Sequence, residues 1–143
     1  MRILSLALAC VALLGWSTSG WSQDKVVSMV GTWLVKSDGM SLGQSLHPEH
    51  SHSEAEPKAT VVSLRWVVDK QSGSSFSGTV IGQSGAKERF VGSVTKDGKR
   101  GVVINARGGV TDFVMLDANS FEGCFAMRND KQLAAGCNTG TRQ

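Results

Sequence analysis

Two cysteines near the end of the chain, Cys124 and Cys137, are the residues whose chemistry the sequence places most firmly. They lie on two strand-like segments that flank the polar turn 129–132. If this turn closes a hairpin with Arg128 opposite Leu133, the two cysteines fall directly opposite each other on neighbouring strands. In an oxidising compartment, two thiols placed in this way form a bond. We therefore predict a cross-strand disulfide between Cys124 and Cys137.

All three histidines of the chain, His47, His50 and His52, lie in the segment 43–58, together with several glutamates. Imidazoles with nearby carboxylates are the ligand set of Zn(II), Cu(II) or Ni(II), so the three histidines are candidate metal ligands. The prolines, serines and glutamates of the same segment are typical of a flexible, solvated loop. Metal capture by this loop is therefore one hypothesis for function, beside those given below.

Catalytic and nucleic-acid-binding motifs are not evident in the sequence. No pattern places a serine or thiol nucleophile beside a histidine, and no glycine-rich loop opens a helix to hold a phosphate. The basic residues are scattered and the net charge is only +3, unlike the clustered charge of nucleic-acid-binding proteins. We predict a protein that is not an enzyme, needs no cofactor and binds no nucleic acid.

The first 22 residues resemble a secretory signal peptide, because Arg2 precedes the apolar run 3–14 and small residues follow as far as Ser22. The apolar run is shorter than the roughly 20 residues that span a bilayer, and no later segment qualifies. We expect no transmembrane segment in the mature chain, which would be one domain over 23–143. The location predicted for it is secreted or periplasmic.

Alternation of apolar and polar residues recurs along the mature chain, and no segment keeps a helical period for three turns. The expected strands are 29–37, 59–69, 75–83, 88–95, 100–108, 110–117, 121–128 and 133–142. The links from the second strand onward are short, which favours successive antiparallel neighbours. The prediction is an all-β fold, an eight-stranded antiparallel up-and-down β-barrel, with a β-sandwich as the alternative.

Turn residues also predict how neighbouring strands pair. Candidate turns lie at 84–86, 97–99, 108–109 and 117–119. The pairs that follow are Val80 with Phe90, Val94 with Val102, Ile104 with Phe113, and Met115 with Phe121. These pairings keep one apolar set on a single inner face, which supports the assignment.

The predicted inner face is rich in aromatic residues and also carries several glycines. Inward glycines indicate strong bending, rings lying on bare backbone, or vacant volume. The aromatic residues would then fill a core or line an apolar pocket with Thr111 and Asn138 as polar anchors. The candidate ligand-binding residues are Trp33, Trp66, Phe90, Phe113 and Phe125.

The tripeptide Gly31-Thr32-Trp33 at the start of the first strand resembles the Gly-x-Trp opening of lipocalin and avidin-like barrels, together called calycins. The resemblance implies that an arginine of the last strand packs across Trp33 and closes one barrel end, and Arg142 holds the matching position. The chain has no tyrosine, whereas the biotin sites of avidins resemble one another in using tyrosine. Biotin is therefore not the expected ligand.

Taken together, these features predict a non-catalytic binding protein that holds a small apolar ligand in the mouth of the barrel. The alternative is a protein-interaction barrel, such as a secreted protease inhibitor or an envelope-associated module, whose loops contact a protein partner. Metal capture by the histidine loop is the third possibility.

Overall fold

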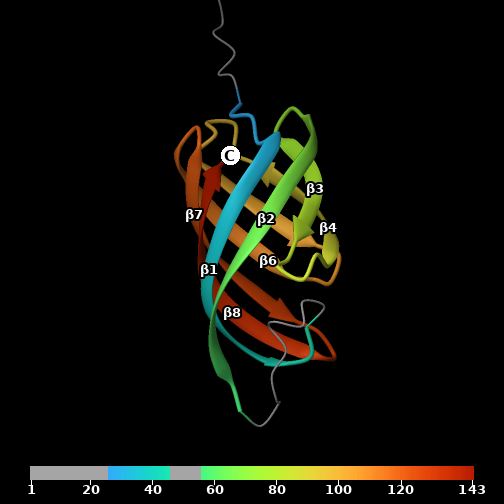
Figure 1. Cartoon of the computed structure of the whole chain (residues 1–143). Coiled ribbons are helices and arrows are strands. Elements are labelled where there is room, and N and C mark those ends of the chain that lie inside the picture. The colour runs from blue at the N-terminus through green and yellow to red at the C-terminus, as the bar shows by residue number, and fades with distance from the viewer. Residues whose placement is uncertain (1–25, 46–55) are drawn as a thin grey trace, which may run out of the picture.

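Eight antiparallel strands form a closed barrel in the computed structural model, which describes residues 26–45 and 56–143. Each strand pairs with the next along the chain, and the last pairs with the first (Figure 1). The strands are β1 (Gly31–Gly43), β2 (Lys58–Ser72), β3 (Ser75–Ile81), β4 (Lys87–Val94), β5 (Arg100–Asn105), β6 (Val110–Asp117), β7 (Ser120–Arg128) and β8 (Gln132–Arg142). The barrel predicted from the alternating pattern is confirmed, and the sandwich is excluded. Among the described residues, no helix has the length and apolar character needed to cross a membrane.

The two hairpin pairings at the C-terminal end are confirmed. Cys124 lies opposite Cys137 between β7 and β8, and Met115 lies opposite Phe121 between β6 and β7. The first strand is longer than predicted and ends at Gly43, because its pairing with β8 continues to Gln132, the first residue of β8.

The pairing of β5 with β6 differs from the prediction, since Ile104 lies opposite Val110 and not Phe113. The turn is longer than the expected Gly108-Gly109 pair. It is held by the Asn105 side chain, whose Oδ1 accepts hydrogen bonds from two backbone N–H groups of the turn, at 3.1 and 2.7 Å. Such capping of a turn by an asparagine side chain changes loop length, and loop length fixes register.

The pairing of β4 with β5 is also wrong in the prediction, because the connecting loop is one residue longer than expected. Val94 lies opposite Gly101 and not Val102. Side chains alternate between the two faces of a strand, so a shift of one residue exchanges the faces. Val103 is consequently buried in the core, and Ile104 points outward with 47% exposure.

The predicted pairing of Val80 with Phe90 is wrong by two residues, which leaves both side chains on the inner face. Val80 lies opposite Glu88, and Phe90 lies opposite Gly78. Both Val80 and Phe90 are buried, as the alternation predicts.

Every phenylalanine in the chain lies directly opposite a glycine of a neighbouring strand. The pairs are Phe76 with Gly92, Phe90 with Gly78, Phe113 with Gly101, Phe121 with Gly140, and Phe125 with Gly136. A Cβ atom added at Gly140 would lie 2.1 Å from Cε1 of Phe121, and one at Gly101 would lie 2.2 Å from Cζ of Phe113. Of the explanations for the inward glycines, rings covering bare backbone is therefore the one seen at these positions.

Phe121 is the centre of an aromatic cluster that fills one end of the barrel. Its ring centroid lies 5.5 Å from that of Trp33, 5.2 Å from that of Trp66 and 5.3 Å from that of Phe113. Phe90 extends the cluster through Trp66, at 5.5 Å. Rings at these separations add favourable contacts to the burial of their apolar area. We call this half of the interior the closed half.

Arg142 closes the barrel end beyond this cluster. Its guanidinium carbon lies 4.3 Å from the ring centroid of Trp33, and its N–H groups donate to the backbone oxygens of Ser28, Val30 and Ala118. The indole N–H of Trp33 donates to the Met29 oxygen at 2.8 Å. The contact between arginine and tryptophan that the calycin resemblance implies is thus present.

The Arg142 side chain should contribute measurably to stability, because it combines a cation–π contact with hydrogen bonds to three backbone oxygens. We expect Arg142→Ala to lower the free energy of unfolding in urea by about 1–3 kcal/mol. Arg65→Ala, a change of an exposed arginine on β2, is the matched control and should stay within about 0.5 kcal/mol of the parent protein. Equal unfolding midpoints for the parent protein and Arg142→Ala would contradict this role.

Candidate ligand-binding site

The interior of the barrel contains a cavity of about 100 Å³ in the half away from the Arg142 closure. All eight strands contribute to its wall, which lies toward the end where β7 turns into β8 (Figure 1). We call this the open-end cavity. Its apolar lining includes Val62, Leu64, Trp66, Val80, Val103, Phe125, Met127 and Ala134.

Polar side chains from inward positions of the same strands also line the cavity. They are Ser37, Ser41, Thr60, Glu88, Asn105, Thr111, Gln132 and Asn138. In the closed half, by contrast, the inward positions carry aromatic rings and aliphatic side chains. The interior is therefore packed at one end and partly empty and polar at the other.

Two amide oxygens in this cavity have no hydrogen-bond donor among the described residues. They are Oδ1 of Asn138 and Oε1 of Gln132, and both residues are only 5–6% exposed. A buried acceptor without a donor costs about 1–3 kcal/mol, so native proteins usually satisfy such groups with water or a bound molecule. The cavity thus offers two acceptors to whatever occupies it.

The two acceptors lie at different depths. Gln132 pairs with Gly43 at the end of β1, near the mouth of the barrel, whereas Asn138 pairs with Ser37 further inside. At about 3.3 Å per residue, the stretch of β8 between them spans roughly 20 Å. A small molecule therefore reaches one acceptor, and Asn138 is the deeper anchor.

Trp66 marks the boundary between the cavity and the aromatic cluster. Its ring stacks on Phe121 and contacts Phe90 on the side of the closed half, while the residue also lines the cavity. Packing from that side holds the indole in place, so the cavity has a rigid apolar floor. Trp66 is consequently a natural fluorescent reporter of occupancy.

The predicted ligand-binding residues are divided between the two halves of the interior. Trp66 and Phe125 line the open-end cavity. Trp33, Phe90 and Phe113 lie in the core of the closed half with at most 2% exposure and do not line it.

Several cavity residues were not among the predicted site residues. Glu88 is the only carboxylate among the described lining residues, and it is buried on β4 on the same face as Phe90. For Glu88 the signal was available, because alternation along β4 places it with Phe90. Gln132 was missed because it was predicted to lie in the turn 129–132, whereas β8 begins at this residue. The predicted inward orientation of Thr111 and Asn138 is confirmed by their burial.

The candidate metal ligands His47, His50 and His52 lie outside the described residues, so metal capture stays a prediction. Within the part of the chain that the structure describes, no group of three or more histidine, cysteine, aspartate or glutamate side chains could hold a metal ion.

The carboxylates with shifted pKa values lie on the surface and not in the cavity. The pKa of Asp69 is lowered by a hydrogen bond from Arg89, that of Asp97 by one from the Thr95 hydroxyl, and that of Asp117 by one from the Ser120 hydroxyl. A lowered pKa in the folded state means that ionisation favours folding above the usual value of 3.8. These contributions are lost as the pH falls below that value.

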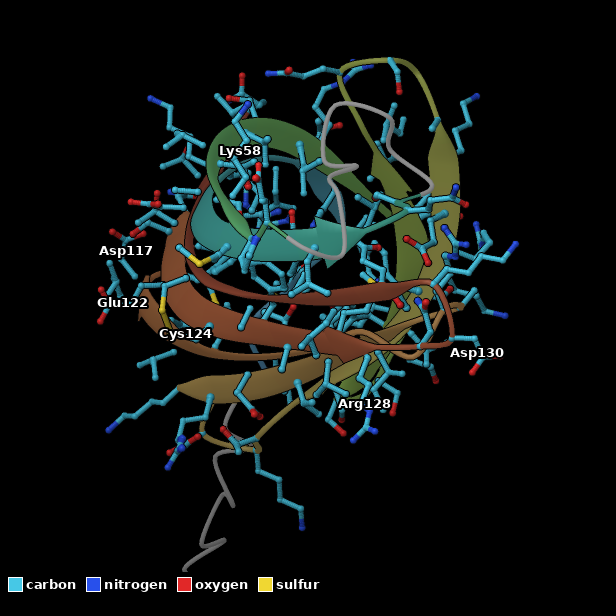
Figure 2. The ribbon with its side chains drawn as sticks, turned by 90° about the horizontal axis from the view of Figure 1, so that it is seen from below. Lys58, Asp117, Glu122, Cys124, Arg128 and Asp130 are labelled. Carbon is cyan, nitrogen blue, oxygen red and sulfur yellow. A yellow bond between two sulfur atoms is a disulfide. The ribbon has the colours of Figure 1, made fainter. Side chains whose placement is uncertain are left out.

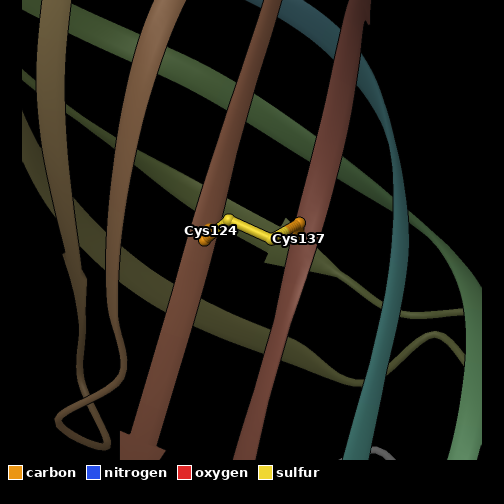
Figure 3. The surroundings of a disulfide bond; sticks show 2 residues. All are labelled: Cys124 and Cys137. Atoms are coloured by element: carbon orange, nitrogen blue, oxygen red, sulfur yellow. A yellow bond between two sulfur atoms is a disulfide. The ribbon is translucent and has the colours of Figure 1, made fainter.

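The predicted disulfide between Cys124 and Cys137 is confirmed. It joins β7 to β8 on the outer wall, where both cysteines are exposed (Figure 3). A disulfide of this kind is compatible with an oxidising extracellular or periplasmic location.

Removing this bond should weaken the pairing of β7 with β8. The bond links residues 13 positions apart, for which loop-closure entropy gives roughly 3 kcal/mol. We expect the double variant Cys124→Ser with Cys137→Ser to lower the unfolding free energy in urea by about 2–4 kcal/mol. The parent protein treated with a reductant should show the same loss, and an unchanged midpoint in both samples would contradict the prediction.

Comparisons with known proteins support the fold and leave the family open. No protein-family model matches the sequence. No curated protein matches it at a significant level either. Among solved structures, EF1p2_mFAP2b bound to DFHBI is similar, with a TM-score of 0.53 and 11% identity, and the match covers 85% of this chain and 100% of that one.

Two further solved structures are less similar. The redesigned β-barrel b11L5F_LGL has a TM-score of 0.45 at 12% identity, covering 85% of this chain and 95% of that one. The S-type phycobiliprotein lyase CPES from Guillardia theta has a TM-score of 0.33 at 13% identity, and the match covers 80% of this chain and 88% of that one. At such low identity, the comparison with EF1p2_mFAP2b shows a shared barrel fold and nothing finer.

Proposed function

We propose that the protein is a non-catalytic binding protein, secreted or periplasmic, that holds a small molecule in the open-end cavity. The observation that carries the proposal is a cavity enclosed by all eight strands in which buried amide oxygens lack donors. A barrel of eight strands is just wide enough to be filled by side chains or to hold one small ligand. In this barrel, side chains fill the interior completely only in the closed half.

The chemistry of the lining refines the apolar ligand expected from the sequence. Trp66 and Phe125 offer apolar surface, while Oδ1 of Asn138 offers an acceptor. The favoured ligand therefore has an apolar body and at least one N–H or O–H donor. A volume of about 100 Å³ is well below the 300–1,000 Å³ of sites for drug-sized ligands, and an apolar cavity of about 150 Å³ holds benzene. The ligand should therefore be no larger than a single ring.

Two observations support this proposal from outside the cavity. The contact of Arg142 with Trp33 matches the barrel closure of calycins, whose lipocalin and avidin-like members are ligand-binding barrels. The solved structure of EF1p2_mFAP2b contains DFHBI, so a barrel of this general shape accommodates a small molecule. Metal capture depends on the segment 43–58, most of which lies outside the described residues. A protein-interaction barrel would bind its partner through its loops, and both functions stay predictions.

Phenol and benzene are suitable probes, because they share a ring and differ in one donor. We expect saturable quenching of tryptophan fluorescence by both, with phenol bound more tightly. Asn138→Leu keeps the approximate volume of the side chain and removes the acceptor, so it should weaken phenol binding up to about tenfold and leave benzene binding unchanged.

Thr139→Val, which changes the neighbouring outward side chain on β8, is the matched control and should bind both probes like the parent protein. The proposal would be wrong if neither probe gave a saturable signal at millimolar concentration. Equal weakening of phenol and benzene by Asn138→Leu would show that Asn138 is not the donor-binding group.

A further inference from the structure

The open-end cavity carries charge of one sign. The Glu88 side chain lines it from β4 and is only 6% exposed. None of the described lining residues is a lysine, an arginine or a histidine. Arg107 comes opposite Glu88 when the register of β4 with β5 is continued into the turn, but it does not line the cavity and forms no ion pair with Glu88. The ionised carboxylate therefore makes the cavity favourable for a cation.

The polar groups that this cavity offers to a ligand are acceptors. Oδ1 of Asn138 and Oε1 of Gln132 have no donor among the described residues. A carboxylate has about four acceptor sites, so Glu88 accepts from a ligand in addition to any bond that it forms within the protein. Around the closed barrel, β4 and β8 are four strands apart in either direction, which places Glu88 and Asn138 on opposite walls. A ligand group with several N–H donors and a positive charge matches this arrangement.

The apolar floor of the cavity lies in the same row of paired residues as this carboxylate. Val80 on β3 pairs with Trp66 on one side and with Glu88 on the other. At about 4.8 Å between neighbouring strands, the backbones of Trp66 and Glu88 are roughly 10 Å apart. A ligand of one ring that meets Glu88 with its charged end thus places its apolar body on the side of Trp66. Cations are also accepted beside tryptophan rings.

We propose that the ligand of the open-end cavity is a protonated amine of one apolar ring, with its ammonium group on Glu88. The inference rests on the proposed function and names the chemical class of the ligand. A neutral donor satisfies Asn138 alone, whereas an ammonium group also offsets the cost of burying the Glu88 carboxylate. An anionic ligand is disfavoured, because it would bring a second negative charge beside Glu88.

Piperidine and tetrahydropyran are matched probes, because each is a saturated six-membered ring and only piperidine carries a charged N–H group. Like other aliphatic amines, piperidine is protonated at about pH 7. Titration calorimetry at constant ionic strength should show that the parent protein binds piperidine at least about tenfold more tightly than tetrahydropyran. This comparison depends on no variant.

Glu88→Gln keeps the shape of the side chain and removes its charge. It should lower the affinity for piperidine at least about tenfold and leave phenol binding within about twofold of the parent protein, which shows that the cavity is intact. The matched control is Glu122→Gln, which removes an exposed carboxylate that points away from the barrel (Figure 2). This control should bind piperidine and phenol like the parent protein.

The outcomes separate this inference from the function on which it rests. If phenol binds but piperidine binds no more tightly than tetrahydropyran, the inference is overturned and the proposed function stands. A Glu88→Gln variant that keeps the preference for piperidine would also overturn the inference, as would an equal loss of piperidine affinity in Glu122→Gln. Failure of all the ring probes to bind would overturn both.

Discussion

The packing of phenylalanine rings on glycine backbone determines how this barrel is filled. In each of the five pairs the ring lies over the opposite glycine, in space that a Cβ atom would otherwise occupy. A ring laid sideways on a neighbouring strand fills volume near the wall, and the bare glycine lets the strands bend tightly. Four of these five rings lie in the closed half, so a few aromatic residues pack it densely.

The open-end cavity follows from where this packing stops. Beyond Trp66, serine, threonine and amide side chains share the inward positions with apolar residues, and these side chains are small or end in polar groups. They leave space and introduce acceptors that the described part of the barrel does not satisfy. The packed half then gives the cavity a rigid floor, and the Arg142 contact with Trp33 seals the far end. The densely packed core and the proposed binding site thus occupy different halves of one interior.

The sequence predicted much of this architecture for identifiable physical reasons. Alternation located the strands, and the polar turn predicted at 129–132 fixed the register of β7 and β8, with the disulfide as its consequence. The registers from β3 to β6 were missed because they depend on loop lengths, and the Asn105 side chain determines one of these by capping its turn. Pairing each phenylalanine with a glycine would have given the correct register of β5 with β6, since Phe113 lies opposite Gly101.

The candidate site was predicted less completely than the fold. Alternation identifies inward residues but not the depth at which each lies, so Trp33 and Phe113 could not be distinguished from Trp66 as lining residues. The volume of a cavity depends on how rings tilt over their neighbours, which a pattern of residue types does not contain. Alternation along β4 places Glu88 on the face of Phe90, whereas Gln132 was predicted to lie in the turn 129–132 and not in a strand.

A double-mutant cycle on Phe121 and Gly140 tests the central claim most directly, because the three atoms nearest to a Cβ atom at Gly140 would all be ring atoms of Phe121. Urea unfolding of the parent protein, Gly140→Ala, Phe121→Leu and the double variant gives the four free energies. We predict that Gly140→Ala costs about 1–3 kcal/mol in the parent protein and less than about 0.5 kcal/mol when Phe121 is leucine. An equal cost in both backgrounds would contradict the account.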